Sequence, residues 1–318
     1  MDVTPSKNST IVRSRNMVRL TRAALQTAYI VSEELGTSFA ERLFTTPRRH
    51  RRPDRERAVL ASARPLTVEV TLRSPHADGT RCTLAAWRWG RGPVVLLVHG
   101  WEGRGSQLGA LVEPLVAAGM TVVAFDAPGH GDSPEHRLYL TDLADCIADV
   151  AAAVGPLHGI VAHSFGAAGA LLAQVRGGLI APRYVMLAPN VLIDDAVRRF
   201  ARVVGLDDRD RDALELRLAA HTGVAPAALS LDRLVAARDG SLLIVHDRAD
   251  REVPFEHGAR LAAAWPTSEL IATEGLGHRR ILRDPQVLAR AVEFLRDGVA
   301  PARSDLVREV DRWLDQLE

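Results

Sequence analysis

Beyond residue 93 the chain alternates short apolar segments with longer segments of helical spacing, and this alternation constrains the fold more than any other feature. The short segments are rich in β-branched residues and bounded by Gly, Pro or Asp, which is typical of strands. They are Val94–Val98, Thr121–Phe125, Gly159–Ala162, Tyr184–Leu187, Leu242–Val245 and Glu269–Ala272. The helix-like segments between them are 106–118, 138–154, 165–176, 255–265 and 284–297. Apolar strands separated by helices predict a parallel sheet covered on both faces.

Two more strands are predicted before this alternation begins. Leu66–Leu72 alternates apolar with polar residues, and Cys82–Trp89 follows the turn at 76–79. The chain has 318 residues, 47% hydrophobic and 25% charged, so it can bury a core and is neither wholly disordered nor a small disulfide scaffold. We expect Cys82 and Cys146 to be free thiols. Neither a transmembrane helix nor a secretory signal is predicted, so we expect a cytoplasmic protein.

The first 64 residues form a basic arm, with thirteen Lys and Arg against six Asp and Glu, although the whole chain has a net charge of +1. Residues 17–44 predict one long amphipathic helix. Residues 47–53 are rich in Arg and predict a solvated linker; because no aromatic residue is interleaved, nucleic-acid binding is not favoured. Four roles stay open for the helix: packing on its own domain, joining two copies in a homo-oligomer, covering the lid, or contacting an anionic membrane.

A long interval at residues 190–239 interrupts the alternation and divides the predicted core into 65–189 and 240–298. Short helices are predicted there at 197–204, 213–220 and 229–237. Because ligands bind at the carboxyl edge of such sheets, we expect this insertion to be a lid. A structural excursion elsewhere on the surface is the alternative. Residues 299–318 predict a C-terminal helix, centred on Ser304–Leu317, without chemistry.

A candidate nucleophile lies in Ala162-His-Ser-Phe-Gly166, between a predicted strand and a predicted helix. A serine on such a sharp turn projects its hydroxyl above the sheet, and the small residues Ala162 and Gly166 permit the turn. The helix that follows directs N–H groups at developing negative charge. Ser164 is therefore the predicted nucleophile.

A serine hydroxyl needs a base, and His278 has the best setting, in the glycine-rich loop after the last predicted strand. The carboxylate that orients this imidazole should follow the preceding strand, where Asp247 and Asp250 are available. We choose Asp250, because Asp-x-x-Val-Pro places it in the loop before the next helix, and we assign Asp247 to bracing the turn. The turn at His99-Gly-Trp101 predicts an oxyanion hole made by the backbone N–H groups of Trp101 and Phe165. Trp101 and His163 are predicted to contact the substrate.

Together these segments resemble the α/β-hydrolase superfamily over about residues 66–297. The resemblance rests on the His-Gly turn, the serine elbow, Asp-x-x-Val-Pro and the final Gly-His, in the family's order, and on 126–133, which looks like a loop that closes the site wall. It implies an α/β fold with an eight-stranded, mostly parallel sheet, helices on both faces and a lid after the sixth strand. It also implies a serine hydrolase that forms an acyl-enzyme. Ala162 departs from the first glycine of the elbow.

The leading functional prediction is a carboxylic-ester hydrolase, or esterase, acting on a small or medium acyl substrate. Thioesterase, peptidase and carbon–carbon-bond hydrolase activities share the same triad, and the sequence does not separate them. The alternative from another class is a ligand-binding or signalling protein of hydrolase shape with little turnover. Neither a metal nor any other cofactor is predicted, since no clustered metal ligands or complete dinucleotide fingerprint occur.

Overall fold

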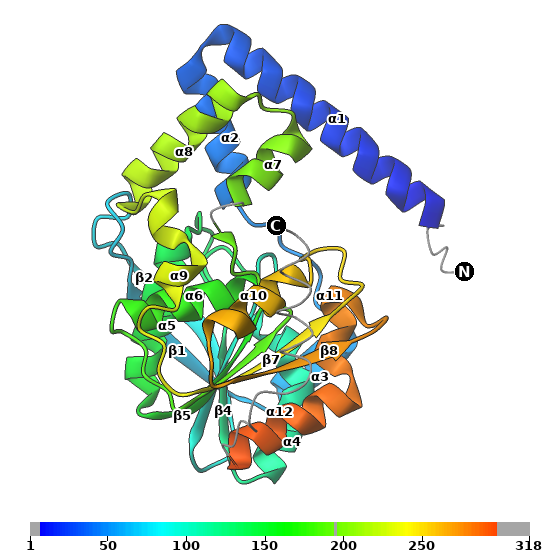
Figure 1. The fold of residues 1–318 in the computed structure, drawn as a ribbon, viewed down its shortest axis with the longest axis vertical. Helices are drawn as coiled ribbons and strands as arrows, with labels where there is room; N and C mark the ends of the chain where they lie inside the picture. The colour runs from blue at the N-terminus through cyan, green and yellow to red at the C-terminus, as the bar shows by residue number, and fades with distance from the viewer. Residues whose placement is uncertain (1–6, 194–195, 298–318) are drawn as a thin grey trace.

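The computed structural model describes residues 7–193 and 196–297. An eight-stranded sheet forms its centre, in the order β1-β2-β4-β3-β5-β6-β7-β8 (Figure 1). Strand β2 is antiparallel to both of its neighbours, and β3 to β8 pair in parallel. The expected eight-stranded, mostly parallel sheet is thereby confirmed. The strands are β1 (Arg64–Thr71), β2 (Arg81–Trp89), β3 (Val94–Val98), β4 (Thr121–Phe125), β5 (Leu157–His163), β6 (Arg183–Leu187), β7 (Ser241–Asp247) and β8 (Ser268–Thr273).

Two hydrophobic cores cover the two faces of the sheet, because successive side chains of a strand point to opposite faces. On β3, Leu96 and Val98 belong to one core, whereas Val95 and Leu97 belong to the other. The first core includes side chains of α5 (Leu140–Val154), α6 (Phe165–Val175), α9 (Leu231–Leu234) and α10 (Glu256–Ala264). The second includes those of η1 (Gly105–Leu111), α4 (Val112–Ala117), η4 (Ile281–Arg283) and α12 (Pro285–Asp297). Burial on both faces explains why these strands are apolar throughout.

The N-terminal arm differs from the single helix that its spacing predicts. It forms α1 (Lys7–Val31) and α2 (Glu33–Thr45), and the break between them lies at Ser32. The Ser32 hydroxyl accepts a hydrogen bond from the N–H of Leu35, so Ser32 is the N-cap of α2. A third helix, α3 (Asp54–Ala61), was not predicted. Its first turn carries Asp54 and Glu56, which favour a helix start.

The insertion at 190–239 is helical, with α7 (Ala196–Val204), α8 (Asp208–Thr222), η3 (Pro226–Leu229) and α9. Helix α8 begins earlier than predicted because Asp207 caps it, accepting a hydrogen bond from the N–H of Asp210. Helices α1, α2, α7 and α8 gather at one end of the molecule, apart from the sheet (Figure 1). They enclose a third apolar cluster containing Leu25, Ala40, Val204 and Leu214. A lid role for this insertion stays a prediction.

Other predictions about the chain concern its surroundings. Within the described residues, none of the helices combines the length and hydropathy needed to cross a membrane. Cytoplasmic location and assembly through the N-terminal helix stay predictions. Both cysteines are free, and burial raises the pKa of the Cys82 thiol to about 11. The predicted helix at Ser304–Leu317 lies outside the described residues.

Candidate active site

Ser164 lies at the junction of β5 and α6, in a backbone conformation that few residues adopt. Its φ is 53° and its ψ is −121°, and such left-handed strain is typical of functional sites. Gly166 is required nearby, because a Cβ there would lie 2.5 Å from the carbonyl oxygen of His99. Ala162, at the other small position of the elbow, is fully buried in β5. The local sequence therefore folds as the sharp strand-to-helix turn that was predicted for it.

His278 and Asp250 meet above the carboxyl end of the sheet. The Nδ1 atom of His278 lies 2.7 Å from an Oδ2 atom of Asp250, and both side chains are buried. His278 was expected in an open loop, but it belongs to a single helical turn, α11 (Gly277–Arg280). Gly277 has a φ of 62° and Gly275 a φ of 77°, so glycine allows the chain to turn sharply from β8 into α11.

Asp250 is held as an anion by several donors. Its Oδ1 accepts hydrogen bonds from the N–H groups of Glu252 at 2.8 Å and Val253 at 3.0 Å. Burial by itself would raise the pKa of Asp250. The bonds from His246, His278 and the backbone outweigh burial and hold that pKa well below its usual value. An ionised Asp250 can keep the Nδ1 proton on His278, which leaves the Nε2 atom free to accept another.

Asp247, the other carboxylate considered, serves the turn rather than the imidazole. Its Oδ2 accepts hydrogen bonds from the hydroxyl of Thr273 at 2.9 Å and from the N–H of Leu276 at 2.8 Å. Its Oδ1 accepts the N–H of Ala249 at 3.0 Å. These bonds join the end of β7 to the segment that carries His278. Asp247 therefore acts on His278 only by positioning its backbone.

His163 lies directly beside His278. Its Nε2 atom is 3.0 Å from the carbonyl oxygen of His278, and the two ring centroids are 4.7 Å apart. Burial lowers the pKa of His163 to about 3, so the ring is neutral and can donate its Nε2 proton to that carbonyl. The predicted substrate contact of His163 is compatible with its place in the pocket wall. The bond to His278 was not predicted.

The His-Gly turn at the end of β3 packs against the serine. A Cβ on Gly100 would lie 2.8 Å from the Cβ of Ser164, so only glycine allows this approach. The turn thereby brings Trp101 next to the elbow, and the Trp101 ring meets the Phe165 ring edge-on at 5.7 Å. The two N–H groups predicted to form an oxyanion hole thus come from segments in contact with each other.

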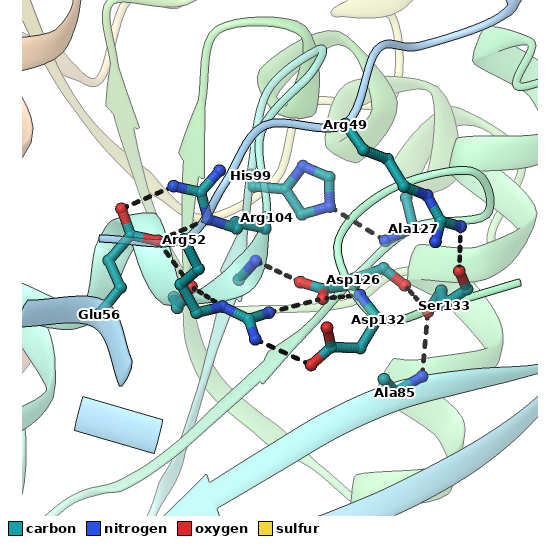
Figure 2. Close-up of polar contacts among 12 residues, drawn as sticks. Arg49, Arg52, Glu56, Ala85, His99, Arg104, Asp126, Ala127, Asp132 and Ser133 are labelled. Atoms are coloured by element: carbon teal, nitrogen blue, oxygen red, sulfur yellow. Dashed lines mark hydrogen bonds and ion pairs between the residues drawn. The ribbon is translucent and has the colours of Figure 1, made fainter. Parts of the chain in front are cut away.

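The loop at 126–133 supports the turn from below (Figure 2). The Nε2 atom of His99 accepts the N–H of Ala127 at 3.0 Å. Asp126 is fully buried and accepts the N–H groups of Gly105 at 2.7 Å and Asp132 at 2.8 Å. The structure therefore places this loop as a brace between the His-Gly turn and the sheet.

Residues 47–53, here called the strap, are largely exposed, as expected for a solvated linker, but several of their side chains also make specific contacts. Arg48 donates from Nε to Glu102 at 2.7 Å, and Arg49 donates from Nε to the carbonyl oxygen of Gly129 at 3.2 Å. Arg52 lies 2.9 Å from the carboxylate of Asp132 and 3.5 Å from that of Asp126 (Figure 2). The basic run is therefore bound to the turn after β3, through Glu102, and to the loop at 126–133. These contacts could not be predicted from the sequence, because the partners are 52 to 84 residues away.

Two hollows meet at this site. The polar pocket has a volume of about 510 Å³ and contains Ser164 and His278 in its wall. The apolar chamber has a volume of about 340 Å³. Trp101 and Asn190 line both hollows, so they form the partition between them. The polar pocket is further lined by His50, Arg55, Glu56, Glu102, Arg104, Glu252, Arg279 and Arg283. The apolar chamber is further lined by Leu43, Phe44, Leu138, Tyr139, Phe165, Val197, Phe200 and Leu218.

His246 is a site residue that sequence reasoning missed. It is fully buried near the end of β7, and its Nε2 atom lies 3.1 Å from the carbonyl oxygen of Val253 and 3.6 Å from Asp250. A histidine facing inward at the end of a strand, four residues before the chosen carboxylate, was the available signal. Within the described part of the chain, no three His, Cys, Asp or Glu side chains gather as metal ligands would.

Comparison with known proteins gives a consistent picture. Residues 95–291 match the alpha/beta hydrolase family. A monoacylglycerol lipase of Mycolicibacterium smegmatis is 28% identical, over 67% of this chain and 92% of that protein. A thermophilic esterase of Thermogutta terrifontis superposes with a TM-score of 0.56 at 18% identity, covering 73% of this chain and 99% of the esterase. An esterase of Pyrococcus furiosus gives a TM-score of 0.58 at 18% identity, covering 80% and 98%.

Proposed function

The chain belongs to the alpha/beta hydrolase family, and from this premise we propose that it is a serine hydrolase that cleaves a carboxylic ester. The observation that carries the proposal is the buried His278–Asp250 pair, 2.7 Å apart, in the same pocket as Ser164 on its strained turn. A serine of this kind becomes a nucleophile only when a base removes its proton. The pair supplies a base whose charged form Asp250 would stabilise.

The proposed reaction has two halves. His278 takes the hydroxyl proton of Ser164 on Nε2 while the serine oxygen attacks the ester carbonyl. The N–H groups of Trp101 and Phe165 would stabilise the oxyanion that forms. His278 then gives its proton to the departing alcohol, which leaves an acyl group on Ser164. A water molecule, deprotonated by His278 in turn, releases that acyl group as a carboxylic acid.

The two hollows support an ester with one apolar and one polar side. An acyl chain would enter the apolar chamber, whose wall includes Phe165, the residue after the nucleophile. The alcohol would face the polar pocket with its arginines and glutamates. The monoacylglycerol lipase relative is named for a substrate with this division, a fatty chain esterified to a polar alcohol. A lid role for 190–239 accords with this arrangement, since α7 and α8 line the chamber.

The proposal is tested by replacing the nucleophile. Ser164→Ala should lower kcat/KM for p-nitrophenyl acyl esters by at least about 10³-fold, because no acyl-enzyme can form. A fluorophosphonate probe should label the native chain at position 164 and leave the variant unlabelled. Retained circular dichroism would show that the variant is folded.

Ser62→Ala is the matched control, because Ser62 is exposed at the end of α3 and makes its bond only to the carbonyl oxygen of Val59. It should keep the native rate and the native labelling. Equal ester turnover by native protein and Ser164→Ala would refute the proposal. Absence of labelling and turnover in the native chain would instead favour the ligand-binding alternative.

A further inference from the structure

The apolar chamber carries an inference that goes beyond ester hydrolysis. Among the residues that the structure describes, no charged side chain lines it, and the polar lining side chains belong to Thr45, Tyr139, Asn190 and Thr222. Such a hollow, with few polar groups, is suited to an aliphatic ligand. Its walls come from three parts of the chain: the core, the insertion and helix α2 of the arm. Helix α2 lies outside the part of the chain that matches the family.

The chamber is next to the reacting atoms. Asn190 donates its backbone N–H to the carbonyl oxygen of Ser164 at 3.1 Å, and its residue lines both hollows. Trp101, the other shared residue, packs against Phe165. A chain attached through its carbonyl to Ser164 would therefore begin next to Trp101 and Asn190, the two residues that also line the chamber.

Helix α2 supplies an aromatic wall. Phe44 meets Phe200 of α7 edge-on, with ring centroids 5.1 Å apart. Both rings line the chamber but not the polar pocket. Arm and insertion thus close the chamber together, at a contact that neither could make alone.

A buried polar cluster fixes this wall in place. Glu41, one turn before Phe44 on α2, is fully buried. Its carboxylate accepts hydrogen bonds from the Tyr139 hydroxyl at 2.9 Å, from Arg217 Nε at 2.9 Å, and from His221. These partners come from the core and from α8, so α2 is tied to both. Because Arg217 is an ion-pair partner of this buried carboxylate, movement of α2 away from α8 would separate the pair.

The chamber volume limits the ligand. A methylene occupies roughly the volume of one water molecule in liquid, about 30 Å³. The 340 Å³ of the chamber would then hold about eleven such groups if it were filled completely. Because this volume per group already includes the space between packed groups, eleven is an upper limit, and a chain of about eight to ten carbons fits within it.

We infer that the apolar chamber binds a medium-length acyl chain of about eight to ten carbons, and that Phe44 of the N-terminal arm limits its length. The inference rests on the proposed ester hydrolysis for its kinetic readout. It assigns the arm a function in substrate selection, which the family match does not include.

The test measures kcat/KM for p-nitrophenyl esters from two to sixteen acyl carbons. In the native protein it should rise by about fourfold for each added methylene up to the limit, since each buries apolar surface, and then fall. Phe44→Ala removes a ring of roughly four methylene volumes, so the optimum should move to chains about two to four carbons longer. Phe44→Trp should move it to shorter chains.

Phe39→Ala is the matched control. Phe39 is on the same helix and packs on the same apolar cluster, yet it does not line the chamber. It should show a comparable loss of thermal stability and the native chain-length profile. A native profile in both folded Phe44 variants, or the same shift in Phe39→Ala, would overturn the inference.

A binding measurement separates this inference from the proposed function. Calorimetry can measure the binding of decanoate to the Ser164→Ala variant, which needs no catalysis. The affinity for decanoate should fall when Phe44→Trp is added to this variant. If native protein shows no Ser164-dependent hydrolysis but decanoate binds in this way, the proposed function fails and the acyl site stands. If hydrolysis depends on Ser164 but the affinity for decanoate does not change with Phe44→Trp, the inferred acyl site is wrong and the proposed hydrolase function is supported.

Discussion

The polar pocket and the apolar chamber lie on either side of Trp101, yet they are held together by opposite means. The turn that carries Trp101 and Glu102 of the polar pocket is held by two neutral imidazoles, since His99 accepts the N–H of Ala127 and His130 accepts the N–H of Glu102. The apolar chamber is enclosed by helices, and its stability depends on a charged cluster around Glu41 that lies behind the wall. Charged side chains therefore line the polar pocket itself, whereas at the apolar chamber the charged cluster lies behind the wall.

This difference between the two hollows determines how an ester would be oriented in the site. An ester with a fatty chain and a polar alcohol has only one favourable orientation, because either end would lose hydration or apolar contact in the wrong hollow. The N-terminal arm contributes to both hollows, through the strap on the polar side and through α2 on the apolar side. A segment without catalytic groups thus shapes the whole site.

The largest expected effect comes from Asp250→Asn, a substitution that should impair the polar pocket and leave the apolar chamber intact. In Asp250→Asn the side-chain oxygen can still accept the N–H groups of Glu252 and Val253, but its amide would present a donor to His278. The imidazole would adopt the wrong tautomer, and kcat should fall by about 10³–10⁴-fold. Steady-state kinetics with a short ester would measure the loss, and decanoate binding should remain native.

Asp247→Asn provides the contrast, because Asp247 braces the turn through Thr273 and Leu276. Its loss should lower the melting temperature, with a smaller fall in kcat than in Asp250→Asn. If Asp247→Asn proved the more damaging to kcat at full folding, the assignment of the two carboxylates would have to be reversed.

The second prediction concerns Glu41→Gln, a substitution that should weaken the wall of the apolar chamber and leave the polar pocket intact. Hydrogen bonds and neighbouring cations hold the pKa of Glu41 below its usual value despite the burial that would raise it, so Glu41 is ionised at neutral pH. Glu41→Gln leaves Arg217 without its buried partner and should lower the free energy of unfolding by about 3 kcal/mol. Urea denaturation would measure it.

Glu34→Gln is the matched control, since Glu34 pairs with the same Arg217 at 2.6 Å but is 78% exposed. An exposed pair contributes about 0–1 kcal/mol, so this change should be small. Equal losses in the two variants would show that burial of Glu41 contributes nothing to the attachment of α2.

The third prediction concerns the loss of stability at acid pH, which is the smallest effect when it is counted for each histidine separately. Burial lowers the pKa of His99 to about 4 and that of His130 to about 3, and both rings accept a backbone N–H, which requires the neutral form. Below the unfolded pKa of about 6.5, the unfolded chain binds protons that the folded chain does not. Stability is therefore complete above pH 6.5 and is lost as the pH falls from 6.5 toward 4.

Each of these two buried histidines should lower the free energy of unfolding by about 2 kcal/mol at pH 5 relative to pH 7.5. Urea denaturation at the two pH values would measure the sum. Within the described ranges, histidine is absent from the lining of the apolar chamber, so acid should loosen the polar side first. An unfolding free energy that is the same at both pH values would contradict the neutral state of these imidazoles.

The strands and the elbow could be predicted because their signals are local. Val94–Val98 and Thr121–Phe125 have the predicted bounds, since both are short apolar runs rich in β-branched residues, the first preceded by Pro93 and the second followed by Asp126. The pairing of His278 with Asp250 follows from chain order, because neighbouring parallel strands end at the same sheet edge.

The arm could not be predicted in the same way. Ser32 looks like one polar residue within a continuous helical pattern, and only the packing of α2 on α8 makes its capping position favourable. The strap reads as a charged linker because its partners, such as Glu102 and Asp132, are about 50 and 80 residues away. Periodicity contains no information about which distant loop a given arginine will reach.

The amino-acid order by itself determined the sheet, the strained serine turn and the set of candidate catalytic groups, since each depends on residues within one strand–turn–helix unit. Only the tertiary structure decided that the arm returns to close both hollows, and that Phe44 meets Phe200. The physical reason is that helix and strand propensities act over a few residues. Complementary packing and buried charge select among surfaces that come together only after the chain has folded.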